Sequence, residues 1–414
     1  MYETPLTALV LSGGGARAAY QVGVLRALAR IRRAALGPKA RLNNPFGVIV
    51  GTSAGAINAA ALAVQADRFE AAVEVLAKVW SHFNAEQVYR ADSLGVIRSG
   101  AQWLTMLSVG WLIARWRRAR PRSLLDNRPL AGLLAQMVPL NRLPMMFEQR
   151  QLHAFAITAS SYTSGEHVTF YDAREAIEPW QRSQRLAVQG RLTQAHLLAS
   201  SAIPFVFPAT QLQIGGQAGW FGDGSMRQTA PLSPAVHLGA QRLVIIGAGR
   251  MQEPTGRVGA STAYPNLAQI AGHAMASIFL DALAVDIERM KRINRTLALL
   301  PDSALADTPL RPLEALVISP SQRLDDIAAR HLGALPLPVR TLLRGVGVNQ
   351  KQGEQTQGSA LASYLLFEAP FTRELMALGE ADTDARKDEV LRFFGWDTMP
   401  GRARVAGQPD IMLP

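Results

Sequence analysis

Short apolar runs that end in glycine turns alternate with stretches of helical periodicity at the start of the chain. Residues 7–11 form such a run, three glycines follow, and Ala, Leu and Val recur at helical spacing over residues 16–36. Residues 46–50 form a second apolar run, which leads through a glycine turn into an Ala-rich stretch ending near Ala66. Two strand–turn–helix units in succession predict a parallel sheet covered by helices, and thus an α/β fold.

The remainder of the chain predicts further strands and a helical end. Residues 153–160 and 167–171 alternate between apolar and polar positions around a Thr-Ser-Gly turn, which predicts a hairpin. Residues 67–150 are typical of a mainly helical insertion, and helical patterns dominate again after the last predicted strand. We therefore expect a domain over residues 1–320, which contains the insertion, and a helical extension over residues 321–414.

The sharpest chemical signal is a G-x-S-x-G pentapeptide between the second predicted strand and its helix. It consists of Gly51, Thr52, Ser53, Ala54 and Gly55. A serine nucleophile needs its hydroxyl on a tight turn with little steric cover, and small neighbours permit that backbone. The start of the following helix favours the negative charge that develops there. The pattern predicts Ser53 as a nucleophile, whereas an ordinary helix N-cap serine is the structural alternative.

The first turn between strand and helix is rich in glycine. Its residues are Gly13, Gly14, Gly15, Ala16 and Arg17. Uncovered backbone N–H groups in such a loop can bind an anion. The loop matches a G-x-G-x-x-A dinucleotide pattern, but no acid that could hold a ribose lies between Glu3 and Asp67, and no Gly-Lys-Ser/Thr follows as in a P-loop. An oxyanion hole beside Ser53 fits these residues better.

Two residues compete for the role of general base. Asp223 follows a hydrophobic stretch and precedes Gly224 and Ser225, so burial would raise the pKa of its carboxyl and make it a usable base. Asp223 with His237 would instead follow the Ser, acid, His order of the α/β-hydrolases. Only one predicted strand precedes the unit that carries Ser53, which is too few for that fold. We therefore favour Asp223 as the base, and an Asx-turn aspartate is the plain alternative.

These three motifs, in this order, resemble those of the patatin-like phospholipase family over residues 6–320. The resemblance implies a three-layer α/β/α sandwich with a mostly parallel central sheet, here with a helical C-terminal extension. It also implies hydrolysis of lipid acyl esters, of the phospholipase A or lysophospholipase kind, without a metal or an organic cofactor. An acyltransferase on the same residues and a non-catalytic scaffold that docks on membranes remain the alternatives. Product analysis with and without an acceptor alcohol separates hydrolysis from acyl transfer.

The resemblance also assigns roles to individual residues. Ser53 would be the nucleophile and Asp223 the proton acceptor of a dyad without histidine. The three loop glycines would bind the oxyanion of an acyl-serine pathway, and Arg17 occupies the family's basic position. Two departures are small: Ala18 replaces the last glycine of the loop, and Ser225 replaces the Gly or Ala that follows Asp-Gly.

The composition narrows the classes of binding partner and argues against thiolate and metal sites. The 414 residues contain no cysteine, and the seven histidines show no metal-binding spacing, so we expect neither a thiolate site nor a metal site. The formal charge of +11 suits an anionic partner. No nucleic-acid-reading motif accompanies that charge, so a membrane surface is the better candidate. Lipid headgroup, acyl position and oligomeric state stay open.

One segment has the composition of a membrane-surface helix. Residues 101–114 are largely apolar, and the segment 101–122 holds three tryptophans and five arginines. A helix packed over the active site is the equal alternative. Because the N-terminus does not resemble a secretory signal and no run of eighteen apolar residues occurs, we expect no spanning helix. We expect a cytoplasmic protein with a peripheral contact at the inner face of the membrane.

Overall fold

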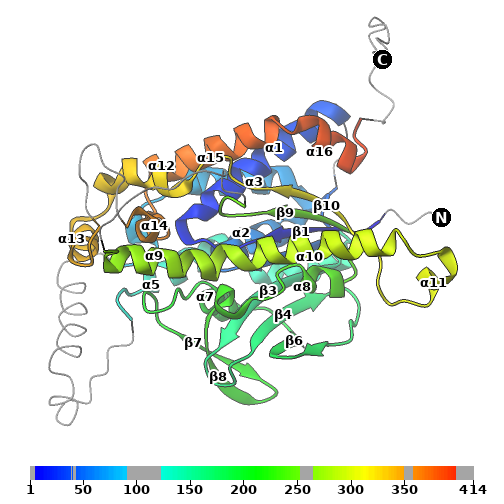
Figure 1. The fold of residues 1–414 in the computed structure, drawn as a ribbon, viewed down its shortest axis with the longest axis horizontal. Helices are drawn as coiled ribbons and strands as arrows, with labels where there is room; N and C mark the ends of the chain where they lie inside the picture. Colours follow the sequence, from blue (N-terminus) through cyan, green and yellow to red (C-terminus); the bar gives the residue numbers. More distant parts are fainter. Residues whose placement is uncertain are drawn as a thin grey trace, which may run out of the picture.

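A ten-stranded mixed sheet forms the centre of the molecule (Figure 1). The computed structural model describes residues 5–38, 40, 43–90, 123–251, 264–348 and 358–397. The strands follow the order β10-β9-β1-β2-β3-β4-β6-β5, and β8 pairs with both β3 and β7. Their bounds are β1 (Thr7–Leu11), β2 (Val48–Thr52), β3 (Ala154–Ser161), β4 (His167–Ala173), β5 (Gln181–Arg182), β6 (Arg185–Gln189), β7 (Thr210–Ile214), β8 (Gln217–Asp223), β9 (Arg242–Ile246) and β10 (Glu314–Ile318).

Five neighbouring strands, from β10 to β3, run parallel. Leu11 at the end of β1 is in register with Gly51 near the end of β2, so the two glycine turns leave the same edge of the sheet side by side. The predicted hairpin is confirmed, because β3 and β4 pair antiparallel. Antiparallel pairing of β8 with β3 adds a further turn to this edge. Ligand sites in open α/β sheets lie at the carboxyl ends of such strands.

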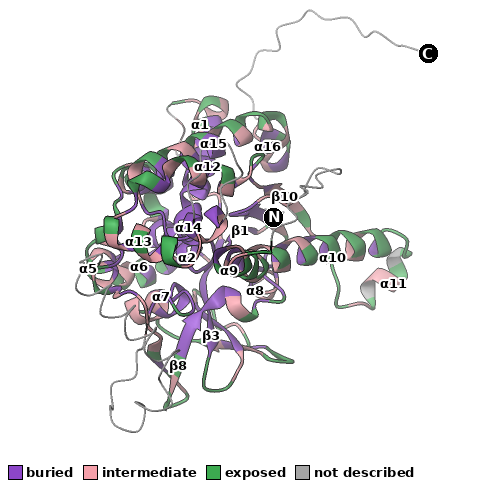
Figure 2. Cartoon of the chain, turned by 60° about the vertical axis from the view of Figure 1, so that its left-hand side comes forward, coloured by how far each residue is buried: buried purple, intermediate pink, exposed green. Residues whose placement is uncertain are grey.

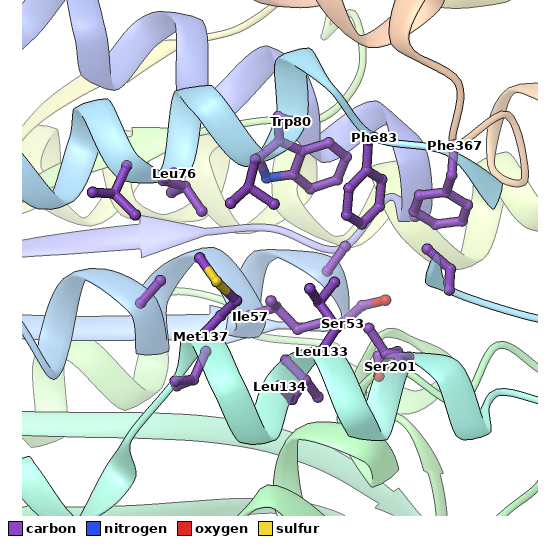
Figure 3. A pocket seen from close by; sticks show the side chains of 18 of the residues that line it. Ser53, Ile57, Leu76, Trp80, Phe83, Leu133, Leu134, Met137, Ser201 and Phe367 are labelled. Carbon is purple, nitrogen blue, oxygen red and sulfur yellow. The ribbon is translucent and has the colours of Figure 1, made fainter. Parts of the chain in front are cut away.

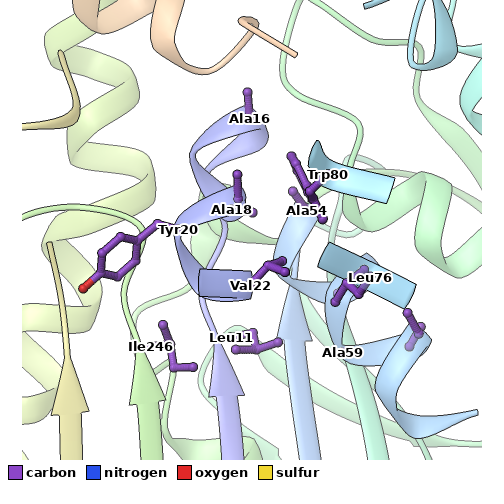
Figure 4. Close-up of a cluster of buried hydrophobic side chains, with 14 of the residues drawn as sticks. Leu11, Ala16, Ala18, Tyr20, Val22, Ala54, Ala59, Leu76, Trp80 and Ile246 are labelled. Atoms are coloured by element: carbon purple, nitrogen blue, oxygen red, sulfur yellow. The ribbon is translucent and has the colours of Figure 1, made fainter. Parts of the chain in front are cut away.

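Helices cover both faces of the sheet. Along β1, Leu9 and Leu11 belong to one hydrophobic cluster, while Ala8 and Val10 belong to the other. The first cluster packs against α1 (Ala19–Leu36), α2 (Ala54–Ala63) and α3 (Phe69–Ser81), and Figure 4 shows Leu11 and Ile246 pointing toward these helices. The second packs against α8 (Ser233–His237) and α10 (Ala282–Leu297). The predicted α/β fold, with a mostly parallel sheet between helical layers, is confirmed, and buried residues fill its centre (Figure 2).

The remaining helices surround this core. In the insertion, α5 (Arg128–Met137) and α6 (Leu143–Glu148) follow α3 among the described residues, and α7 (Gln194–Ser200) precedes β7. Two short 3-10 turns, η1 (Gly15–Ala18) and η5 (Gly224–Arg227), follow β1 and β8. Later helices are α9 (Leu267–Ala276), α11 (Asp302–Ala306), α12 (Leu324–His331), α13 (Leu337–Gly345), α14 (Ser359–Ser363), α15 (Ala369–Asp384) and α16 (Lys387–Phe394).

One long helix covers the face of the sheet that carries the second hydrophobic cluster. A π-helical turn, Ser277–Asp281, joins α9 and α10 into a continuous helix of 31 residues, Leu267–Leu297, with a mean hydropathy of 1.5 in its most apolar window. By length and composition it could cross a membrane, but a helix that covers a sheet passes the same test, so the expectation of no spanning helix stays a prediction. In the sequence, scattered polar residues interrupt this segment, so it contains no run of eighteen apolar residues. Leu283, Ile287 and Met290 pack into the second core cluster, as expected of a helix that covers a sheet.

Two of the helices after β10, α15 and α16, pack directly on α1. Gly23 and Gly379 mark the crossing of α1 with α15, because a Cβ on Gly23 would lie 1.9 Å from the carbonyl oxygen of Met376. A Cβ on Gly379 would lie 2.3 Å from the carbonyl oxygen of Tyr20. The extension is helical, as predicted, and it shares the first hydrophobic cluster with the sheet. A domain boundary at residue 320 stays a prediction.

Two glycine substitutions should change stability in opposite directions. Gly23→Ala should lower the free energy of unfolding by about 3 kcal/mol, because the new methyl group would force α15 away from α1. Gly132 also lies within a helix, α5, but no atom surrounds its Cβ position, so Gly132→Ala should raise that free energy by about 0.5–1 kcal/mol. Urea unfolding of both variants measures the two effects. A neutral Gly23→Ala variant would contradict the close crossing.

Candidate active site

The strand β3 brings the two predicted dyad residues together. Thr52, the last residue of β2, is in register with Thr158 of β3, and Asp223, the last residue of β8, is in register with the adjacent Ala159. Ser53 follows Thr52 directly, and its Oγ donates a hydrogen bond of 2.6 Å to Oδ2 of Asp223. Ser53 is 1% exposed to solvent and Asp223 is 0% exposed. The arrangement has the geometry of a nucleophile bonded to its base.

The backbone at Ser53 has a conformation that residues other than glycine seldom adopt. Its φ of 56° and ψ of −132° lie outside the common regions, so the turn is strained. Glycine is needed on either side: a Cβ on Gly51 would lie 2.4 Å from Cα of Ala56, and one on Gly55 would lie 2.4 Å from the carbonyl oxygen of Ser12. Strain held by close packing is typical of a nucleophile elbow.

Several polar contacts hold this turn in place. The backbone N–H of Ser53 donates to Oγ of Ser200, at 2.9 Å. Oγ1 of Thr52 is bonded to Oγ1 of Thr158, at 2.7 Å, and accepts from Nε2 of Gln228, at 2.9 Å. Sequence reasoning gave Ser200 and Gln228 no role. Ser200 is separated from Ser53 by 147 residues, so the sequence alone does not place the two side by side.

Asp223 is prepared to accept a proton near neutral pH. Burial raises the pKa of its carboxyl to about 6, and hydrogen bonds from the Ser53 hydroxyl and from the backbone N–H of Ser225 oppose that rise. The Ser225 bond, to Oδ1, measures 2.9 Å. Gly224 permits this tight turn, because a Cβ there would lie 2.4 Å from the carbonyl oxygen of Thr158. Above a pH of about 6 the carboxylate form prevails and can act as a base.

The glycine loop passes directly over the dyad. A Cβ on Gly13 would lie 2.3 Å from Oγ of Ser225 and 3.0 Å from Cβ of Ser53. Gly15 has a positive φ of 54° and lines the pocket beside Ser53. Within the described parts of the chain, the backbone N–H groups of Gly13, Gly14 and Gly15 have no acceptor. Uncommitted donors next to a nucleophile are what an oxyanion hole requires.

Arg17 has a different environment from the rest of this loop. Its side chain is buried, and its Nε donates to Oγ of Ser363 at 2.8 Å. The guanidinium is also paired with Asp325 and lies 4.0 Å from the centre of the Tyr364 ring. These partners all belong to the C-terminal helices and to the residue after α14. Arg17 therefore fixes the glycine loop to the C-terminal helices.

The histidines lie elsewhere. His237 Nδ1 is 2.8 Å from the carbonyl oxygen of Ser233, and its ring stacks on Trp180 with 4.6 Å between ring centres. His196 caps α7 and packs edge-on against Phe170. All seven histidines are described, and none is hydrogen-bonded to Ser53 or Asp223. Among the described residues, no group of three or more acidic or histidine side chains could hold a metal ion.

An apolar pocket begins at Ser53. Its empty space, including space open to solvent at its mouth, amounts to about 810 Å³. Figure 3 shows Ser53 and Ser201 at one end and Met137 toward the other. Nothing charged lines the pocket among the described residues. The lining consists of Gly15, Ser53, Ala54, Ile57, Ala61, Gln65, Ala72, Val75, Leu76, Val79, Trp80, Phe83, Val88, Leu130, Leu133, Leu134, Met137, Val138, Ser201, Ile203, Phe207 and Phe367.

The family of the chain follows from a comparison of its sequence with family models. The model described as patatin-like phospholipase matches residues 9–236, which is more than half of the 414 residues. The chain therefore belongs to the patatin-like phospholipase family, as its three motifs predicted. Membership supports a lipid hydrolase activity. No match was found among curated proteins.

Solved structures of low sequence identity overlap most of the chain. VipD from Legionella pneumophila shares 12% identity, with a TM-score of 0.33 over 90% of this chain and 67% of VipD. Human GIVD cytosolic phospholipase A2, solved with methyl gamma-linolenyl fluorophosphonate, shares 13%, with a TM-score of 0.40. That overlap covers 94% of this chain but only 59% of the human chain. ExoU of Pseudomonas aeruginosa, solved with SpcU, shares 16% over 91% of this chain and 71% of ExoU, with a TM-score of 0.24. Such TM-scores add nothing to the family assignment.

Replacing Asp223 with Asn should stabilise the fold at neutral and higher pH. Folding raises the pKa of this carboxyl from 3.8 to about 6, so burial of the ionised form costs on the order of 3 kcal/mol. The cost is fully present above a pH of about 6 and disappears as the pH falls below about 4. Urea unfolding at pH 4 and pH 8 should show a gain for the variant only at pH 8. Equal stability at pH 8 would contradict the burial of the ionised carboxylate.

Proposed function

We propose that the chain is a lipid acyl hydrolase that cleaves fatty acyl esters through an acyl-serine intermediate on a Ser53–Asp223 dyad. The observation that carries the proposal is the 2.6 Å hydrogen bond between these side chains at the head of an apolar pocket. Both groups are buried, and no histidine contacts them by a hydrogen bond. A carboxylate paired with a serine can supply the base for such a reaction.

The proposed reaction has two halves. Asp223 accepts the proton of the Ser53 hydroxyl while Oγ attacks the ester carbonyl carbon, and the backbone N–H groups of the glycine loop stabilise the oxyanion. The tetrahedral intermediate collapses when Asp223 returns the proton to the leaving alcohol, which leaves an acyl-serine. In the second half, Asp223 takes a proton from water, which attacks the acyl-serine. The fatty acid then leaves and Ser53 regains its proton.

Ser53 should be the serine that a fluorophosphonate labels. The strained turn exposes its Oγ to the pocket, and the bond to Asp223 makes it nucleophilic. Ser53→Ala should abolish labelling and ester hydrolysis but keep the wild-type circular dichroism spectrum. Peptide mapping by mass spectrometry identifies the labelled residue. Labelling that persists in Ser53→Ala would place the nucleophile elsewhere.

Asp223, and no histidine, should govern turnover. Asp223→Asn should lower kcat by a factor on the order of 10²–10⁴, the usual contribution of a general base. His237→Ala and His196→Ala serve as controls, because their rings pack on Trp180 and Phe170 and touch neither dyad residue by a hydrogen bond. Steady-state hydrolysis of a soluble ester measures all three variants. A histidine variant as inactive as Asp223→Asn would restore the Ser–His triad.

A peripheral contact with anionic membranes completes the proposal. It is supported by the formal charge of +11 and by the composition of residues 101–122, a segment outside the described residues. Each arginine near an anionic surface contributes about 1 kcal/mol, and salt screens this attraction. Replacing Arg115, Arg117 and Arg118 with Gln should release the protein from anionic liposomes in a flotation assay while hydrolysis of a soluble ester survives. Unchanged liposome binding would move the membrane contact to another surface.

A further inference from the structure

A second side-chain contact joins the turn that carries the serine to the turn that carries the aspartate. Gln228 directly follows η5, the short helix that begins after Asp223, and its Nε2 donates a hydrogen bond of 2.9 Å to Oγ1 of Thr52. Thr52 immediately precedes Ser53, and its Oγ1 is also bonded to Oγ1 of Thr158, at 2.7 Å. Both ends of the Gln228–Thr52 bond are buried. The two turns are therefore linked twice, once through the dyad and once through this amide.

The Gln228–Thr52 bond lies on the face of the sheet opposite the dyad. Side chains alternate between the two faces along a strand, and Val50 of β2 belongs to the second hydrophobic cluster, so Thr52 points toward the same face as Val50. Asp223 is in register with Ala159, which belongs to the first cluster, as do most of the residues that line the pocket. Neither Thr52 nor Gln228 lines the pocket. The amide therefore supports the dyad from behind.

The two links differ in what the proposed reaction does to them. In the resting protein the Ser53 hydroxyl donates to Asp223, but in the acyl-serine the same oxygen carries the acyl group and has no proton to donate. Asp223 must then bind and deprotonate water without this bond. The Gln228–Thr52 bond contains no reacting atom, so it is present in both halves of the reaction. Among the described residues, it is then the one side-chain hydrogen bond that still joins the two turns.

We infer that Gln228 is a positioning residue that keeps Asp223 beside Ser53 while the acyl-serine is hydrolysed. The inference rests on the proposed function, because only an acyl-serine removes the Ser53–Asp223 bond. During acylation that bond itself aligns the nucleophile with its base, so loss of the Gln228 amide has a small effect there. During deacylation no such bond remains, and the position of the carboxylate depends on the support from behind. Loss of the amide should therefore slow deacylation more than acylation.

The kinetics of p-nitrophenyl butyrate hydrolysis test this assignment. The good leaving group makes acylation fast, so deacylation limits kcat, whereas kcat/KM reports the steps up to acylation. Gln228→Met has a side chain of similar length without a donor. It should lower kcat by about tenfold or more, because a small displacement of a catalytic group suffices for such a loss, and leave kcat/KM within about threefold of the wild type. Intact-protein mass spectrometry should find a larger share of acylated protein. Thr52→Val removes the acceptor and should give the same pattern.

Gln151→Met is the matched control. Gln151 precedes β3 at the amino end of that strand, whereas the dyad lies at its carboxyl end, and its Nε2 donates to the carbonyl oxygen of Gln149 at 3.4 Å. Its kcat, its kcat/KM and its share of acylated protein should equal those of the wild type. Titration with a fluorophosphonate, run to completion, counts the active sites in each preparation, so a misfolded fraction lowers the count and leaves the rates per site unchanged.

The outcomes separate the positioning role from the proposed function. A selective fall of kcat with accumulation of acyl-protein in Gln228→Met supports the role. Equal falls of kcat and kcat/KM per titrated site, or no fall in either, would overturn it, while hydrolysis that is lost in Ser53→Ala would keep the proposed function. Hydrolysis that persists in Ser53→Ala, with no acylated wild-type protein, would overturn the acyl-serine pathway and the role of Gln228 together.

Discussion

The position of the candidate active site depends on the pairing of β3 with two strands that are far apart in the sequence. Thr158 fixes the end of β2 and Ala159 fixes the end of β8, so the residues at both ends meet one step apart along a single strand. A slip of one residue in either register would turn the affected side chain to the opposite face of the sheet. The 2.6 Å bond between Ser53 and Asp223 therefore depends on the registers of both β2 and β8 against β3.

Close packing maintains this geometry although the backbone of Ser53 and the burial of Asp223 are each energetically unfavourable. Ser53 adopts a strained φ of 56°, and the carboxyl of Asp223 is buried without a cationic partner in the described contacts. Neither is favourable by itself, and both persist because the glycines of three turns allow neighbouring backbones within contact distance. The apolar clusters on both faces of the sheet supply the compensating stability. Stability and reactivity thus oppose each other at Asp223.

The sequence predicted those parts of the site that are encoded locally. The Ser53 turn, the glycine loop and the Asp223 turn each lie where a strand ends, and apolar runs followed by glycine identify such positions without any knowledge of the fold. The parallel core of the sheet followed from the same runs. Residues 181–189 gave no strand signal, because β5 has only two residues, both polar, and β6 has only a three-residue apolar run; both strands pair with their neighbours in the sheet.

Contacts between distant parts of the chain could not be predicted in this way. Arg17 matched the family's basic position, but its partner Ser363 is 346 residues away, and no local pattern records that contact. The carbonyl oxygen of Tyr364 likewise accepts the backbone N–H of Ala16, at 3.0 Å. The ribosome makes the chain from its N-terminus, so Tyr364 is synthesised long after Ala16. On the ribosome, the nucleophile and the base emerge well before Tyr364, so the loop above them acquires its last supports only when that late segment has been made. An unfinished chain would carry both reactive side chains beneath an unsupported loop.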